Sequence, residues 1–220
     1  LIRAGLEIGV ASSKTFVCSL TALLLLAMHL GIRRGTLEKE RLSELVQELT
    51  HLPYMLGNLL SHQKQYEELA HRYARCSDIL YLGRGINYPL AIEGALKLKE
   101  ISYIHAEGYP AGEMKHGPIS LIDQNMPIVA LIPRDALYEK MLNNVNEVKA
   151  RGGIVIAIAT EGDTDIVTKA NHVIYIPKTP PLLSPLLMAI PAQLLAYHMA
   201  VWRGCDVDQP RNLAKTVTVE

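Results

Sequence analysis

Asp78-Ile79-Leu80-Tyr81-Leu82-Gly83-Arg84-Gly85 is the stretch that decides the fold. It predicts a short apolar strand followed by a glycine-rich turn, after which Pro89 opens a helix, since proline suits the first helical turn. A strand, a tight turn and a helix in this order begin a βαβ unit. The turn does not fit a dinucleotide-binding fingerprint, which needs a further glycine where Tyr88 stands.

Three more apolar runs, at residues 128–132, 154–159 and 172–176, predict strands. Because the runs are continuous rather than alternating, we expect both faces of each strand to be covered, as in a parallel sheet between helices. A long final helix is expected over residues 181–203. The sequence therefore predicts an α/β domain over residues 78–204, in which ligands bind at the carboxyl ends of the strands.

The first part of the chain predicts helices with no strand between them. The apolar run at residues 20–30 is about eleven residues long, short of the roughly 20 that cross a bilayer, so we expect a buried core helix and no membrane span. A second helix is expected over residues 37–52. Pro53 is expected to open a third, which ends near Arg75.

The totals exclude several classes of protein. The 220 residues carry 22 basic and 22 acidic side chains, so no net charge favours nucleic acid or an anionic membrane as a partner. Cys18, Cys76 and Cys205 are far apart and odd in number, which predicts reduced thiols in a cytoplasmic protein. No spacing suggests a metal site or a cofactor. The start at Leu1 lacks a secretory signal, and without Met it indicates a piece of a longer chain.

Residues 93–118 contain the main candidate site. No glycine or proline interrupts residues 95–107, which predicts a helix. Glu93, Lys97 and Glu100 stand at i, i+4 and i+7, so they project from one face over roughly 10 Å. The plain alternative is a solvated face carrying one ion pair, worth a few tenths of a kcal/mol.

Residues 7–12, 93–118 and 206–220 resemble the glutamine–fructose-6-phosphate aminotransferase (glucosamine-6-phosphate synthase) family most densely, and the resemblance extends along the whole chain. It covers the carboxy-terminal isomerase half of that family. There the family carries two sugar-isomerase (SIS) domains, each a flavodoxin-like three-layer sandwich with a five-stranded parallel sheet. The resemblance implies this fold here.

The resemblance also implies a domain organisation. Residues 1–52 would be the carboxy-terminal part of the first SIS domain, which is a helical remnant, and residues 53–77 a linker helix. Residues 78–204 would be the second SIS domain. Residues 205–220 would be an irregular tail that reaches the active site.

The activity that the resemblance implies is the conversion of fructose 6-phosphate and glutamine into glucosamine 6-phosphate, in amino-sugar biosynthesis. In the family a separate amino-terminal domain releases ammonia from glutamine. That domain, and the Ser/Thr-rich stretch that holds the sugar phosphate, are absent from this sequence. We therefore expect an isomerase portion without the glutaminase and without most of the phosphate site.

Four residues match the catalytic pattern of the family, and Glu93, counted with the substrate-binding residues, is expected to assist one of them. Lys215 would form a Schiff base with C2 of the open-chain sugar, and Glu100 would move a proton between C1 and C2. Lys97 would serve the sugar hydroxyls, and Glu93 would orient Lys97. His116 would open the sugar ring from the partner subunit, which implies a homodimer.

Val10, Ser12 and Ala214 match the family's backbone or hydroxyl contacts to the sugar. Plainer interpretations stay open for several of these residues. Ser12 could only cap the helix that follows it. His116 could be a structural hydrogen-bond partner, and Lys215 a solvated lysine of the tail.

Two other functions compete with the isomerase. One is a non-catalytic SIS module that senses a phosphosugar, and the other is an inert dimerisation half. A sensor has no need for a Schiff-base lysine after the last helix, so the tail favours the enzyme. The fold alone does not choose among the three.

Overall fold

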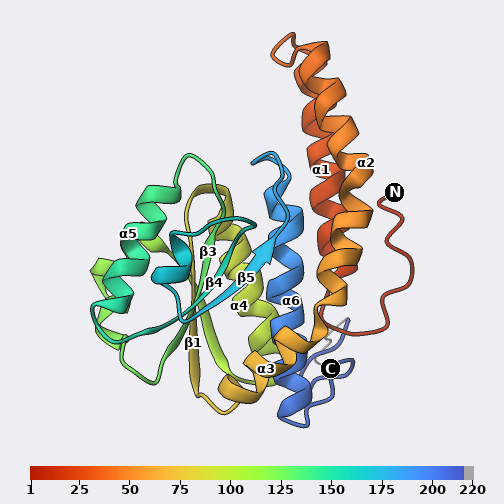
Figure 1. Cartoon of the computed structure of the whole chain (residues 1–220). Coiled ribbons are helices and arrows are strands. Elements are labelled where there is room, and N and C mark those ends of the chain that lie inside the picture. Colours follow the sequence, from red (N-terminus) through yellow and green to blue (C-terminus); the bar gives the residue numbers. More distant parts are fainter. Residues whose placement is uncertain (216–220) are drawn as a thin grey trace.

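A computed structural model describes residues 1–215, which form a three-layer α/β sandwich beside a protruding pair of helices (Figure 1). The sheet lies between α5 on one side and α3, α4 and α6 on the other. This confirms the predicted fold class. The helices are α1 (Lys14–Arg33), α2 (Lys39–Ser61), α3 (Gln63–Tyr73), α4 (Tyr88–Ser102), α5 (Tyr138–Lys149) and α6 (Ser184–Trp202).

The sheet has five strands, all parallel, in the order β2-β1-β3-β4-β5. Strand β1 lies between β2 and β3, so the chain adds β2 on one side of β1 and then β3 on the other. This change of direction makes a topological switch point between β1 and β3. The strands are β1 (Asp78–Gly83), β2 (His105–Pro110), β3 (Pro127–Ile132), β4 (Ile154–Thr160) and β5 (His172–Ile176).

Strand β2 corrects the sequence prediction, which continued the α4 helix to residue 107. The helix ends at Ser102, and Tyr103 takes a left-handed conformation with φ of 61°. The chain then enters β2 at the edge of the sheet, where only Ala106 is fully buried. Because this edge strand contains so few apolar residues, the sequence has no continuous apolar run from which the strand could be predicted.

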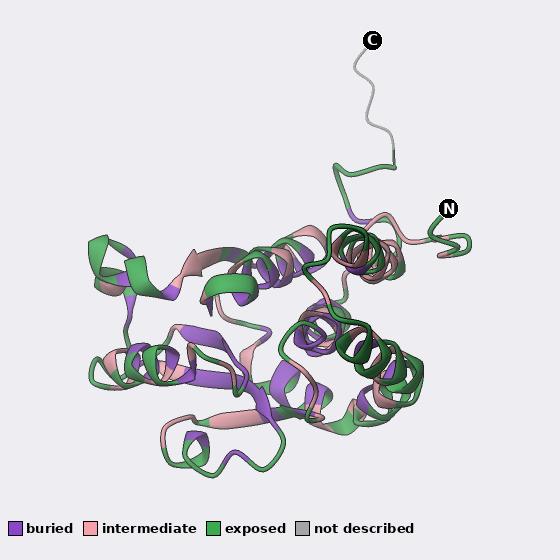
Figure 2. Cartoon of the chain, turned by 90° about the horizontal axis from the view of Figure 1, so that it is seen from above, coloured by how far each residue is buried: buried purple, intermediate pink, exposed green. Residues whose placement is uncertain are grey.

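The two faces of the sheet bury separate cores. Tyr81 and Leu131 face α4 and α6, while Leu82 and Ile132 face α5. Figure 2 shows the burial concentrated in the sheet and the helices next to it, and exposed residues along the outer helices. Helix α4 is thus held between the sheet and α6, which fixes the direction of its remaining face.

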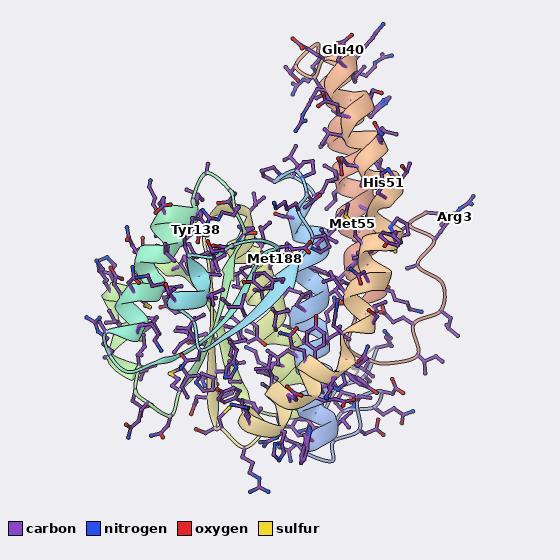
Figure 3. The ribbon with its side chains drawn as sticks, in the orientation of Figure 1. Arg3, Glu40, His51, Met55, Tyr138 and Met188 are labelled. Atoms are coloured by element: carbon purple, nitrogen blue, oxygen red, sulfur yellow. The ribbon has the colours of Figure 1, made fainter. Side chains whose placement is uncertain are left out.

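Helix α2 runs through Pro53, so the prediction that Pro53 opens a new helix is wrong. Leu45, Leu52 and Leu59 recur every seven residues and are all buried, so one apolar face continues across the proline. A proline in a helix interior costs a backbone hydrogen bond, which this packing offsets. Met55 of α2 packs on the core that includes Met188 of α6 (Figure 3).

Helix α1 is not the buried core helix that the sequence predicted. Met28 is its only buried residue, and the leucines of its outer face are exposed. Within residues 1–215 two helices, α1 and α6, are long and apolar enough to cross a membrane by length and composition alone. In α6 two-thirds of that segment is buried, as in the core helix of a soluble domain, against 6% in α1. The exposed leucines of α1 are Leu23, Leu25, Leu26 and Leu30.

Gly108 in β2 tests the contact between the edge strand and α4. A Cβ there would lie 2.5 Å from the Cα of Ile92, so Gly108→Ala must push strand and helix apart. We expect the free energy of unfolding to fall by about 2 kcal/mol, measured by chemical denaturation. Gly57→Ala is the control, because Gly57 is exposed in α2 with nothing within 4 Å and alanine should add up to about 1 kcal/mol. An equal change in the free energy of unfolding for Gly108→Ala and Gly57→Ala would contradict this packing.

Candidate functional site

Helix α4 carries a cluster of three charges that is largely withdrawn from water. The ammonium of Lys97 lies 2.6 Å from Oε2 of Glu100 and 3.7 Å from Oε1 of Glu93. The side chains of Lys97, Glu100 and Glu93 are only 6%, 22% and 12% exposed, respectively. A buried ammonium needs anionic partners to offset its lost hydration. The plain alternative from the sequence, a solvated helix face that carries one ion pair, therefore does not describe this face of α4.

The carboxyl of Glu93 is the least well satisfied member of the cluster. Its burial raises its pKa, the charge of Lys97 lowers it in part, and the charge of Glu100 raises it again, to a pKa of about 7. Its Oε1 is buried without a hydrogen-bond partner. Glu93 can therefore exchange a proton near neutral pH, next to the ammonium that it helps to hold.

The loop before α1 folds around the carboxylate of Glu7. This carboxylate accepts hydrogen bonds from the amides of Ser13 (2.7 Å) and Lys14 (2.8 Å) and from the hydroxyls of Ser12 (3.1 Å) and Thr15 (2.6 Å). Neither serine caps α1 with its own side chain, so the cap expected from Ser12 is supplied by Glu7 instead. The Ser12 hydroxyl is thereby fixed at the start of α1.

The tail docks on this loop and on the end of α4, as far as residue 215. The amide of Val10 donates to the carbonyl of Asp208 at 2.8 Å. The amide of Arg211 donates to the hydroxyl of Tyr103 at 2.7 Å, and its guanidinium lies 4.2 Å above the Tyr103 ring. Lys215 ends 4.0 Å from Oε2 of Glu7. The predicted tail also includes residues 216–220, which lie outside the described residues.

A cavity of about 680 Å³ lies where these elements meet. Glu7 and Ser13 of the loop line it together with Lys97 of α4 and Asp208 of the tail. Arg3, labelled in Figure 3 on the amino-terminal segment, lines it too. The cavity therefore joins the loop, the α4 cluster and the tail in one space.

The cavity does not lie where the sheet rule for ligands predicted. A separate cavity of about 380 Å³ occupies the carboxyl ends of β3, β4 and β5 and contains Arg134 and Asp163 among its lining residues. None of the predicted site residues lines it. Val10 and Lys215 lie instead where the loop and the tail pack together, beside the cavity that Lys97 lines.

Lys97 is the only one of the eight predicted site residues, all of which lie within residues 1–215, that lines the cavity of about 680 Å³. His116 ends the short helix η2 (Ala111–His116), is 76% exposed, and has Glu113 as its ionic neighbour at 3.7 Å. It does not line the 680 Å³ cavity. Ala214 is exposed and directly precedes Lys215. Within residues 1–215 no group of His, Cys, Asp and Glu side chains could hold a metal ion.

Glu93→Gln tests the burial of the cluster through stability. The pKa of Glu93 is about 7 in the folded chain against an ordinary 4.5, so the folded state retains a proton that the unfolded state loses. The free energy of unfolding should therefore fall as the pH rises from about 4.5 to about 7, by at most about 3 kcal/mol. Glu93→Gln should remove this loss in denaturation curves across that range, and Glu40→Gln, at an exposed glutamate of α2, should not. Parallel curves for wild type and Glu93→Gln would contradict the assignment.

Comparison with known proteins places this geometry in a family. A model of the family described as SIS domain matches residues 72–203. A glutamine–fructose-6-phosphate aminotransferase of Thermus thermophilus is 55% identical over 219 residues, which are 100% of this chain and 36% of that protein. The enzyme of the same name from Mesorhizobium japonicum is 51% identical over 218 residues, 99% of this chain and again 36% of the relative. The chain thus spans about a third of the length of these relatives.

Solved structures agree with the sequence comparison. The C-terminal domain of glucosamine-fructose-6-phosphate aminotransferase from Francisella tularensis superposes with a TM-score of 0.90 at 41% identity, over 93% of this chain and 58% of that one. Glucosamine-6-phosphate deaminase from Thermotoga maritima, at 24% identity and a TM-score of 0.69, covers 96% of this chain and 58% of its own and shows the shared fold alone. The chain therefore belongs to the SIS domain family, and along its whole length it is similar to glutamine–fructose-6-phosphate aminotransferases.

Proposed function

We propose that this chain is the isomerase portion of a glutamine–fructose-6-phosphate aminotransferase, which makes glucosamine 6-phosphate from fructose 6-phosphate and ammonia released from glutamine. The names of its relatives support this class of reaction. The observation that carries the proposal is the meeting of three parts at one cavity. The tail brings the Lys215 amine beside Glu7, and Glu7 and Lys97 line the same space.

The chemistry follows from these groups. The neutral amine of Lys215 adds to the C2 carbonyl of the open-chain sugar, and the carbonyl oxygen leaves as water, giving a protonated imine. Ammonia then adds to C2 and displaces the Lys215 amine, which leaves the ammonia nitrogen as a protonated imine at C2. This positive nitrogen accepts the electron pair released when a carboxylate takes the C1 proton, and return of that proton to C2 gives the amino sugar. Glu100 is the proposed base, with Lys97 at 2.6 Å to hold it and to bind sugar hydroxyls. Glu93 is proposed to orient Lys97.

The remaining contacts are proposed along the loop and the tail. Val10 uses its amide on Asp208, which leaves its carbonyl for the sugar. The hydroxyl of Ser12 and the backbone of Ala214 are proposed to contact the same sugar. The glutaminase and the phosphate-binding residues are proposed to belong to parts of a longer cytoplasmic polypeptide. No cofactor is required by these steps, because the Schiff base supplies the electron sink.

His116 is proposed to open the furanose ring in the site of a partner subunit. Its imidazole is exposed and stands outside the cavity of its own chain, as expected for a group that acts across an interface. The proposal therefore requires a homodimer.

Borohydride trapping tests the Schiff base. The polypeptide, at the full length of its relatives, is incubated with fructose 6-phosphate, reduced, digested and mapped by mass spectrometry. We expect a hexitol phosphate adduct on Lys215, because only a primary amine in the site can form a reducible imine. The adduct should vanish in Lys215→Ala and persist in Lys99→Ala, at an exposed lysine of α4. Phosphosugar binding without any adduct would reject the enzyme in favour of the sensing module.

Subunit complementation tests the role of His116. His116→Ala and Lys215→Ala, each expected to lose at least about 100-fold in glucosamine 6-phosphate synthesis, are co-expressed with different tags. If His116 acts across the interface, the mixed dimer holds one intact site, and random pairing should restore about a quarter of the wild-type activity. If His116 acts within its own chain, mixing restores nothing.

A further inference from the structure

Glu7 has no role in the mechanism above, yet its carboxylate is the most heavily bonded in the site. Besides the four hydrogen bonds already described, it accepts one from the hydroxyl of Ser13 at 3.2 Å. All of these donors come from the first residues of α1 or the turn before it. The side chain is only 10% exposed, so its position is set by the helix and not by solvent.

The same carboxylate connects the two ends of the chain. Its Oε2 lies 4.0 Å from the ammonium of Lys215 and also accepts a hydrogen bond from the hydroxyl of Ser12. Two residues farther along, Gly9 packs against Asp208 so closely that a Cβ would lie 3.0 Å from its Oδ1. The tail therefore meets a tightly bonded loop, with Glu7 facing its last described lysine.

We propose that Glu7 is a positioning residue that sets the place of the Lys215 amine, by anchoring it to the amino-terminal end of α1. This inference rests on the proposed function, because it assigns a task to Glu7 only if Lys215 forms the imine. Glu7 does not touch the reacting carbons in this account. It acts through Lys215 and through the Ser12 hydroxyl.

The electrostatics of the loop support a permanent anion at this place. Burial raises the pKa of Glu7, but the hydrogen bonds from Thr15, Ser13, Lys14 and Ser12 outweigh it and lower the pKa to about 2. A fixed anion at this place attracts the Lys215 side chain to the loop. The other charged side chains around the cavity are Arg3, Lys14, Lys97 and Asp208. Removal of the Glu7 charge should thus release the Lys215 side chain from the loop.

The experiment follows adduct formation on Lys215 in the full-length polypeptide as a function of the fructose 6-phosphate concentration. The step joins the Lys215 nitrogen to C2 and releases the carbonyl oxygen as water, and borohydride reduces the imine that forms. In Glu7→Gln we expect the maximal rate to fall about tenfold, because the amine is no longer anchored. The fructose 6-phosphate concentration that gives half of the maximal rate should stay the same.

Thr15→Ala is the matched control. It removes one hydrogen bond to Glu7 and keeps the carboxylate, so it should lower thermal stability without lowering the maximal rate. Glu7→Asp retains the charge with a shorter side chain, and should slow the reaction less than Glu7→Gln does. It serves as the decisive variant if Glu7→Gln does not fold.

Three outcomes are separable. If the wild type forms the adduct and Glu7→Gln forms it at the same maximal rate, the inference is overturned and the proposed function stays intact. Equal behaviour of Glu7→Gln and Thr15→Ala would reduce Glu7 to a structural cap, which also overturns it. If the wild type forms no adduct, the proposed function fails first, and the inference fails with it.

Discussion

The burial of the Lys97 ammonium is the constraint on which the rest of the site depends. A charge so far from water must be offset, and Glu100 and Glu93 do this from the same helix face. The helix in turn packs on the sheet and against α6, and Lys97 on its remaining face lines the cavity that the loop and the tail border. The cost of this arrangement is visible in Glu93, whose pKa is raised to about 7.

The loop before α1 and the tail after α6 supply the other sides of the candidate site on α4. The loop before α1 and the tail after α6 are joined by the contact of Val10 with Asp208, and both border the cavity that Lys97 lines. At this junction Glu7 contributes a carboxylate and Lys215 contributes an amine. The sheet provides the frame, but its carboxyl edge holds a different cavity. The site is thus built on a helix face and closed by the chain ends.

Sequence patterns could predict those parts that depend on local order. The continuous apolar runs identified four strands, and the spacing of Glu93, Lys97 and Glu100 placed them on one helix face. Strand β2 was not predicted, because an edge strand needs little apolar surface. The helix start predicted at Pro53 was wrong, because the buried leucine repeat of α2 continues the helix through the proline. The position of Glu7 in the site was not predicted, because the groups that donate hydrogen bonds to it come from the start of a helix seven residues later. Only the folded loop brings these groups together. The role of His116 across a subunit interface is a proposal that rests on the family resemblance.

A crystal structure of the borohydride-reduced adduct, in the full-length polypeptide, tests the central claim most directly. The account predicts a hexitol bonded through C2 to the Lys215 nitrogen, lying in the cavity lined by Lys97 and Glu7. Its C1 and C2 should lie within reach of the Glu100 carboxylate. A hexitol held elsewhere, for example in the cavity lined by Arg134 at the carboxyl ends of the strands, would contradict the claim that loop, helix face and tail form one site.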